Sequence, residues 1–231
     1  MADTPPTNNN SDSPKKPARK LSLQDQQQAN DINATQQLLG MVQAKSALKA
    51  ALAKIGYDDK EMAIGAMLQA TAFEKYSSRQ TKLASTAQDL SDRDEVSTDV
   101  EDEFSSFRQT VQALYKGADR ATLGASGEVS HDREVFATQA RAAYTAAQKD
   151  PYASKLATRG FPPERVAAAL EALTGYTGAT TTAKSSRKAT PASTKERNAS
   201  VKAMNDWVTE LRRIAKANLK KNPELQALVK E

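Results

Sequence analysis

The stretch Val100-Glu-Asp-Glu-Phe104-Ser-Ser-Phe107-Arg-Gln-Thr-Val111-Gln-Ala-Leu114 decides the fold class of this chain. Its apolar residues follow one another at steps of four, three, four and three positions. That spacing is the a/d pattern of a helix that buries one narrow side against another helix, as in a coiled coil. No glycine or proline interrupts the pattern before Gly117. We therefore expect a long helix that ends near this glycine.

Composition extends the helical interpretation to the whole chain. Of the 231 residues, 39% are hydrophobic and only 5% aromatic, and nine glycines and nine prolines are too few for a turn-rich all-β domain. The chain has no cysteine and a single histidine, His131. This composition excludes disulfide frameworks, thiolate metal sites, cysteine nucleophiles and any site that needs two imidazoles.

A shift of 104 residues relates the two halves of the chain. It places Leu52-Ala53-x-x-Gly56-Tyr57 on Leu156-Ala157-x-x-Gly160-Phe161, and it places the a/d seam on apolar residues around Trp207. Recurrence at a fixed offset indicates an internal repeat. We therefore predict an all-α bundle of long antiparallel helices, built from two related units that each consist of a helix followed by a helical hairpin.

The predicted domains follow from this repeat. They are a disordered basic tail at 1–23, a first helical unit at 24–124 and a second helical unit at 125–231. Hairpins with equal arms have their tips near residues 87 and 192. Residues 177–200 then form the outer part of the second hairpin, although their Thr/Ser/Lys/Ala-rich composition also fits a flexible linker. Both interpretations stay open at this point.

Two segments resemble a known group of proteins. They are Trp207-x-x-x-Leu211-Arg212-Arg213-Ile214-Ala215-x-x-x-Leu219-x-x-x-Pro223-Glu224-Leu225 and Tyr115-Lys116-Gly117-x-x-Arg120-x-x-Leu123-Gly124. Together they resemble a family of bacterial all-helical bundle proteins that end in a Trp-containing helix and a Pro-Glu/Gln-Leu segment. The motifs are packing and turn signatures, so the resemblance implies a fold and no activity, cofactor or ligand.

Sequence motifs that form metal-binding or catalytic sites in other proteins are incomplete in this chain. Glu128-Val-Ser-His131 has the Glu-x-x-His spacing of a di-iron bundle, but such a site needs a second histidine. We therefore interpret His131 as a surface residue near a helix start. The acidic run at 89–103 has no glycine turn for a calcium loop, which favours a solvated helix face, with weak cation binding left open. We predict no catalytic, cofactor or metal site and expect a protein that is not an enzyme.

Charge is distributed unevenly along the chain. Residues 58–117 hold 7 Lys/Arg and 12 Asp/Glu, a net charge of −5, whereas residues 162–222 hold 12 Lys/Arg and 5 Asp/Glu, a net charge of +7. Opposite charges of this size can steer two halves of one chain together, or two chains. The candidate contacts for a polyanion or a partner are five cations of the second predicted hairpin. They are Lys184, Arg187, Lys188, Lys195 and Arg197.

Two functions are compatible with these features. The first is a non-catalytic helical interaction or scaffold protein that binds a protein partner or a second copy of itself. The alternative is a nucleic-acid-associated protein that uses the basic second hairpin. No stretch of eighteen apolar residues is present, and the first twenty residues have no apolar core of a secretory signal. We therefore expect a cytoplasmic protein with no membrane span.

Overall fold

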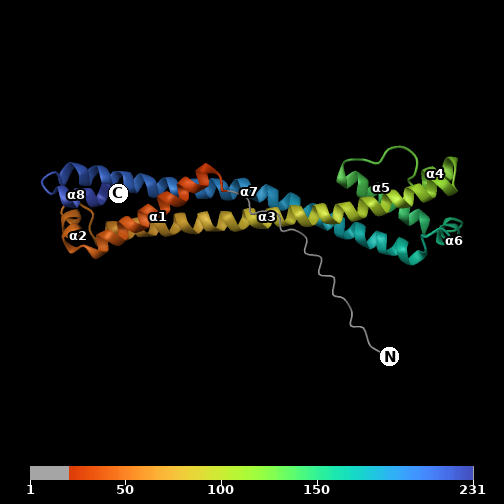
Figure 1. Cartoon of the computed structure of the whole chain (residues 1–231), viewed down its shortest axis with the longest axis horizontal. Helices are drawn as coiled ribbons and strands as arrows, with labels where there is room; N and C mark the ends of the chain where they lie inside the picture. Colours follow the sequence, from red (N-terminus) through yellow and green to blue (C-terminus); the bar gives the residue numbers. More distant parts are fainter. Residues whose placement is uncertain (1–20, 231) are drawn as a thin grey trace, which may run out of the picture. The chain divides into compact units, whose positions relative to one another are not determined.

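All regular structure in the described part of the chain is helical. The computed structural model describes residues 21–230, and it contains eight helices and no strand in this range (Figure 1). The helices are α1 (Leu23–Ala44), α2 (Ser46–Ala53), α3 (Asp59–Leu114), α4 (Gly117–Thr122), α5 (Arg133–Ala147), α6 (Tyr152–Ala157), α7 (Pro163–Asn218) and α8 (Pro223–Lys230). The predicted all-α fold is confirmed. Most of the predicted tail, residues 1–20, lies outside the described residues.

The two predicted hairpins are each a single long helix. Helices α3 and α7 both run for 56 residues without a turn, so the expected tips near residues 87 and 192 are wrong. The first tip was placed by symmetry alone, at a point where the sequence has no glycine or proline to form a turn. Equal arms also placed the second tip, which fell beside Pro191, and α7 contains this proline in its interior.

The polar residues 177–200 belong to α7. Their expected helical state is therefore confirmed and the flexible linker is wrong, but they lie within one continuous helix and not in the outer part of a hairpin. Next to Pro191, hydroxyl groups donate to backbone carbonyls of the same helix, from Thr190 to Ser186 at 3.1 Å and from Thr194 to Thr190 at 3.0 Å. Contacts with α3 then hold the helix in place, because Arg79 Nε donates to Thr194 Oγ1 at 3.0 Å.

Tertiary contacts group the residues into two compact units. Unit 1 extends to Gln69 and resumes at Asn205, and unit 2 is Ala70–Met204. Each unit thus combines the beginning of one long helix with the end of the other. The sequence-based division at residue 124 follows chain order instead, because a repeat in sequence carries no information about which segments pack together.

An aromatic cluster forms the core of unit 2. The four predicted seam residues from Val100 to Val111 are buried. The Phe107 ring lies 4.8 Å from the Tyr144 ring and 5.3 Å from the Phe161 ring, centroid to centroid. The a/d pattern therefore correctly identified the side of α3 that faces the core of this unit.

Unit 1 is organised around the only tryptophan of the chain. Trp207 Nε1 on α7 donates to Glu61 Oε1 on α3 at 2.9 Å, and the edge of its ring meets Tyr57 at a centroid distance of 6.0 Å. The ring lies directly on Gly65, where an added Cβ would be 2.2 Å from Trp207 Cη2. Glycine is required here by the close approach of the tryptophan.

Replacing Gly65 by alanine tests this contact. We expect Gly65→Ala to lower the free energy of unfolding by about 1–3 kcal/mol, because the indole must move away from the helix. Trp207 fluorescence during denaturant unfolding measures the change in unit 1. The matched control is Gly40→Ala on α1, where no atom beyond the adjoining backbone of that helix lies within 4 Å of the added Cβ. It should raise helix stability by up to ~1 kcal/mol. Equal stability of the two variants would contradict the packing described.

Tyr144 makes unit 2 sensitive to alkaline pH. Burial, with a smaller contribution from the charge of Glu103, raises the pKa of Tyr144 well above its ordinary value of 10.0. The folded-state pKa is thus above the unfolded one, so this contribution to stability is complete below pH 10.0 and declines as pH rises further. We expect Tyr144→Phe to flatten the loss of stability between about pH 10 and about pH 12, measured by circular dichroism in urea.

The same variant has a built-in control at neutral pH. The Tyr144 hydroxyl is buried without a hydrogen-bond partner. Its removal should therefore leave stability near pH 7 unchanged or slightly higher. If the free energy of unfolding fell with pH in the same way in the variant and in the wild type, the ionisation of Tyr144 would not be the cause of the loss.

Candidate functional site

Four of the five predicted contact residues lie on one side of α7 in unit 2. Lys184, Arg187, Lys188 and Lys195 are all exposed. Their spacing of three, four and eleven positions from Lys184 brings them to the same helix face. We call these four residues the basic face of α7. The structure therefore brings together most of the cations that the sequence singled out.

A shallow hollow lies at one end of the basic face. It has a volume of about 320 Å³, and Arg93 of α3 joins three members of the basic face and Thr180 around it. Two of these cations have acidic partners, since Arg93 Nη2 lies 2.6 Å from Asp94 and Lys184 Nζ lies 2.8 Å from Glu134. The hollow thus retains a positive lining formed by Arg187 and Lys188.

Arg197 does not belong to the basic face. It lies two residues beyond Lys195, which turns it by about 200° around the helix. Its side chain is 1% exposed. Its Nε and Nη2 donate to Asn198 Oδ1 at 3.1 and 2.8 Å. The sequence-based assignment of Arg197 as a polyanion contact is therefore corrected, because a buried guanidinium of this kind has a structural role.

Three of the eight carboxylates in the acidic run on α3 have partners on other helices of unit 2. Glu103 accepts two hydrogen bonds from Arg165 of α7, at 2.7 and 2.8 Å, and Asp89 accepts one from Ser186. The hydrogen bond from Arg93 is the main cause that lowers the pKa of Asp94, with a smaller contribution from the charge of Arg133. Opposite charges on α3 and α7 thus meet within one chain. In residues 21–230, no group of three or more His, Asp or Glu side chains is placed to hold a metal ion.

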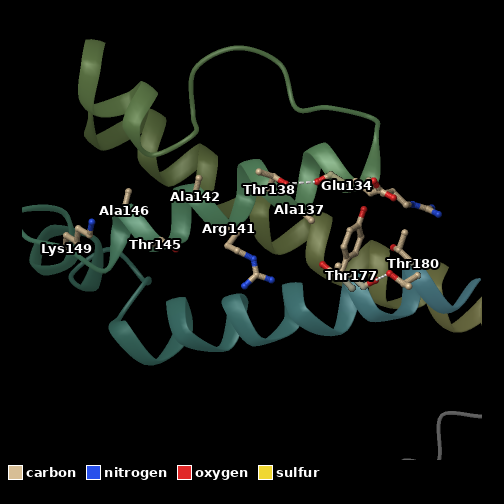
Figure 2. Close-up of a pocket in the computed structure, with 13 residues that line it drawn as sticks. Glu134, Ala137, Thr138, Arg141, Ala142, Thr145, Ala146, Lys149, Thr177 and Thr180 are labelled. Atoms are coloured by element: carbon tan, nitrogen blue, oxygen red, sulfur yellow. Dashed lines mark hydrogen bonds between the residues drawn. The ribbon is translucent and has the colours of Figure 1, made fainter. Parts of the chain in front are cut away.

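A groove between α5 and α7 was not predicted from the sequence. It has a volume of about 720 Å³, and small side chains line most of it. Figure 2 shows Arg141 extending from α5 toward α7, with Thr177 and Thr180 on the facing turns of α7. Arg141 Nη2 donates to Thr174 Oγ1 at 3.5 Å. The signal for the groove was the run of small residues at helical spacing on both helices, but that signal is equally typical of close helix packing.

His131 lies in the segment between α4 and α5 and is exposed, two residues before α5 begins at Arg133. The predicted position near a helix start is confirmed. The cap of that helix is Asp132, whose Oδ1 accepts from the backbone N–H groups of Glu134 and Val135 at 2.9 and 3.1 Å. Glu128 is also exposed.

Comparison with known proteins gave no match. No protein-family model, curated protein or solved structure matches the chain. The resemblance to a bacterial helical family therefore stays a prediction. Among the described helices, none combines the length and the apolar character that crossing a membrane requires.

Proposed function

We propose that the protein is a non-catalytic helical interaction protein whose basic face of α7 binds an acidic surface on a protein partner. The observation that carries the proposal is the alignment of four exposed cations along one side of an uninterrupted helix. Such an arrangement gives a partner a fixed set of charges on a rigid support, which favours selective and fast association.

The location of the charges supports binding rather than catalysis. The cations of the basic face extend along an outer helix surface, from Lys184 to Lys195, and three of them surround only a shallow hollow. A catalytic site would instead gather groups of complementary function around one reacting atom. Partner recognition needs only complementary charge and shape along the helix.

A nucleic acid is the second candidate partner. The specific observation in its favour is the hollow whose positive lining comes from Arg187 and Lys188, because neighbouring cations of this kind neutralise phosphates and release counterions. The basic face has no aromatic side chain on which bases could stack. A duplex backbone therefore fits this surface better than a single strand.

The internal repeat is part of the proposal. Helices α3 and α7 have the same length and begin 104 residues apart, at Asp59 and Pro163. The turn before each is also alike. Tyr57 N–H donates to Leu52 O at 3.0 Å and Phe161 N–H donates to Leu156 O at 3.1 Å, with φ of 95° at Gly56 and 89° at Gly160. These equivalences support an origin by duplication, and a chain with two related halves also supports pairing with a second copy. The cytoplasmic location stays a prediction.

Neutralising the basic face tests the proposed function. The variant combines Arg187→Gln, Lys188→Gln and Lys195→Gln, and it leaves the ion pair of Lys184 with Glu134 in place. We expect it to lose at least about tenfold in affinity for the partner captured from the native cell, measured at low and at physiological salt. A labelled DNA duplex in an anisotropy titration tests the second candidate in the same variant.

The matched control removes the same charge from unit 1. Lys45→Gln, Lys54→Gln and Lys60→Gln replace three exposed lysines and should retain binding. Equal losses in both variants would contradict a role of the basic face and leave only an effect of net charge. A strict monomer of 25.0 kDa without a partner, in light scattering and crosslinking, would contradict the proposed function itself.

A further inference from the structure

Unit 2 has an acidic surface on α3 that the fold leaves exposed. Other carboxylates of the same helix are used inside the unit, since Asp89 and Glu103 accept hydrogen bonds from α7 and Asp94 pairs with Arg133 of α5. The remaining side of α3 faces water. We call the four exposed carboxylates on that side the acidic face of α3. They are Asp92, Glu95, Asp99 and Asp102.

The acidic face is a regular stripe of negative charge. Its members follow one another at steps of three, four and three positions, which places them on one side of the helix. Within residues 21–230, Glu95, Asp99 and Asp102 have no cation at ion-pair distance. Asp92 accepts a hydrogen bond from the neutral side chain of Gln88 at 2.6 Å. The negative charge of this face is therefore not compensated inside the unit.

The basic face of α7 also keeps uncompensated charge. Lys184 is paired with Glu134 of α5. In the part of the chain that the structure describes, Arg187, Lys188 and Lys195 have no carboxylate at ion-pair distance. Unit 2 thus presents three free cations on one helix and at least three free carboxylates on another.

The two faces match in length and in spacing. Each extends over about three helical turns, or about 15 Å. Asp92 and Asp99 are seven positions apart on the acidic face, and Lys188 and Lys195 are seven positions apart on the basic face. When two helices lie side by side, several carboxylates of one face can therefore lie opposite cations of the other.

The acidic and basic faces of one chain lie on different sides of unit 2. Lys184 reaches Glu134 of α5, so the basic face lies on the α5 side of α7. On α3, Asp94 reaches Arg133 of α5, and Asp92 is two positions away, about 200° around the helix. The acidic face is therefore turned away from α5 and does not meet the basic face of its own chain. Both faces are available to a second chain.

We infer that the basic face of α7 binds the acidic face of α3 on a second copy of this chain. The inference rests on the proposed function, because it names the acidic partner. Two different faces meet in this contact, so each copy can bind two neighbours. Exposed ion pairs are individually weak and are screened by salt. The association is therefore reversible and strongly dependent on ionic strength.

Sedimentation velocity of the full chain tests whether copies associate. We expect the average mass to rise above the 25.0 kDa of the monomer as protein concentration increases at about 50 mM salt. At about 500 mM salt the average mass should return to that of the monomer, because screening weakens the contact between the two faces.

Charge reversal then identifies the two faces. One variant combines Arg187→Glu, Lys188→Glu and Lys195→Glu, and the other combines Glu95→Lys, Asp99→Lys and Asp102→Lys. Each variant alone should associate at least about tenfold more weakly, because like charges then oppose each other. An equimolar mixture should associate again, since the acidic face of the first variant and the basic face of the second are both intact. Mixing would not repair a general change in the fold.

The matched control reverses three exposed carboxylates of unit 2 outside the acidic face. It combines Glu74→Lys, Glu128→Lys and Glu171→Lys, which changes the net charge as much as the acidic-face variant does. The control should associate like the wild type. If a reversed variant does not fold by circular dichroism, neutral substitutions decide in the same way. These are Glu95→Gln, Asp99→Asn and Asp102→Asn, compared with Glu74→Gln, Glu128→Gln and Glu171→Gln.

Three results would overturn the inference. The first is a wild-type chain that stays monomeric at low salt at every protein concentration. The second is equal association of the acidic-face variant and its control, which would indicate an effect of net charge. The third is a mixture of the two folded reversed variants that does not associate. If neutralising the basic face still released a partner protein captured from the cell, the proposed function would stand with a different acidic protein as partner.

Discussion

Polar contacts between α3 and α7, rather than a hydrophobic core, hold the middle of α7 in unit 2. Between Tyr176 and Val201, a stretch that the structure describes throughout, the buried apolar side chain is that of Ala183. Hydrogen bonds of Thr194 and Ser186 with α3 take the place of apolar packing. Such contacts have direction, and each buried polar group needs its partner. They therefore fix which side of α7 faces α3 and which side faces water.

The surface chemistry of unit 2 follows from this fixed orientation. Lys195 and Arg197 are close in sequence and identical in charge, yet one is exposed and the other is buried. The same orientation places Thr177 and Thr180 opposite α5 and leaves the groove of Figure 2 between the two helices. Some charges of the acidic and basic stretches pair with each other inside the unit, as in the two hydrogen bonds that Arg165 donates to Glu103. What remains outside includes the basic face of α7 and the exposed carboxylates of Asp92, Glu95, Asp99 and Asp102 on α3.

Sequence was most informative where structure depends on neighbouring residues. The a/d seam and the end of its helix near Gly117 were predicted because helical period and positive φ are local properties. The hairpin tips failed because symmetry was given more weight than the absence of turn residues near residue 87. Arg197 was misassigned because the cations were counted without asking which side of the helix each one faces. Two residues separate it from Lys195, and on a helix that step already places the two side chains on opposite sides. The groove between α5 and α7 could not be predicted, since its lining combines residues 133–149 with residues 176–181, which are far apart in the sequence.

Tyr144 and Tyr176 show why burial of a polar group is not by itself a sign of function. Both rings belong to the core of unit 2, and both hydroxyl oxygens are buried without a partner. Tyr144 is surrounded by packed core residues. Burying its hydroxyl without a partner lowers the free energy of unfolding, and the apolar packing around the ring offsets this loss. Tyr176 lines a cavity with Arg133 and His131, but its oxygen is buried away from that space, and Ser97 and Arg133 act on it from within the unit. In both residues the packing of the aromatic ring, and not the hydroxyl group, accounts for the position in the core.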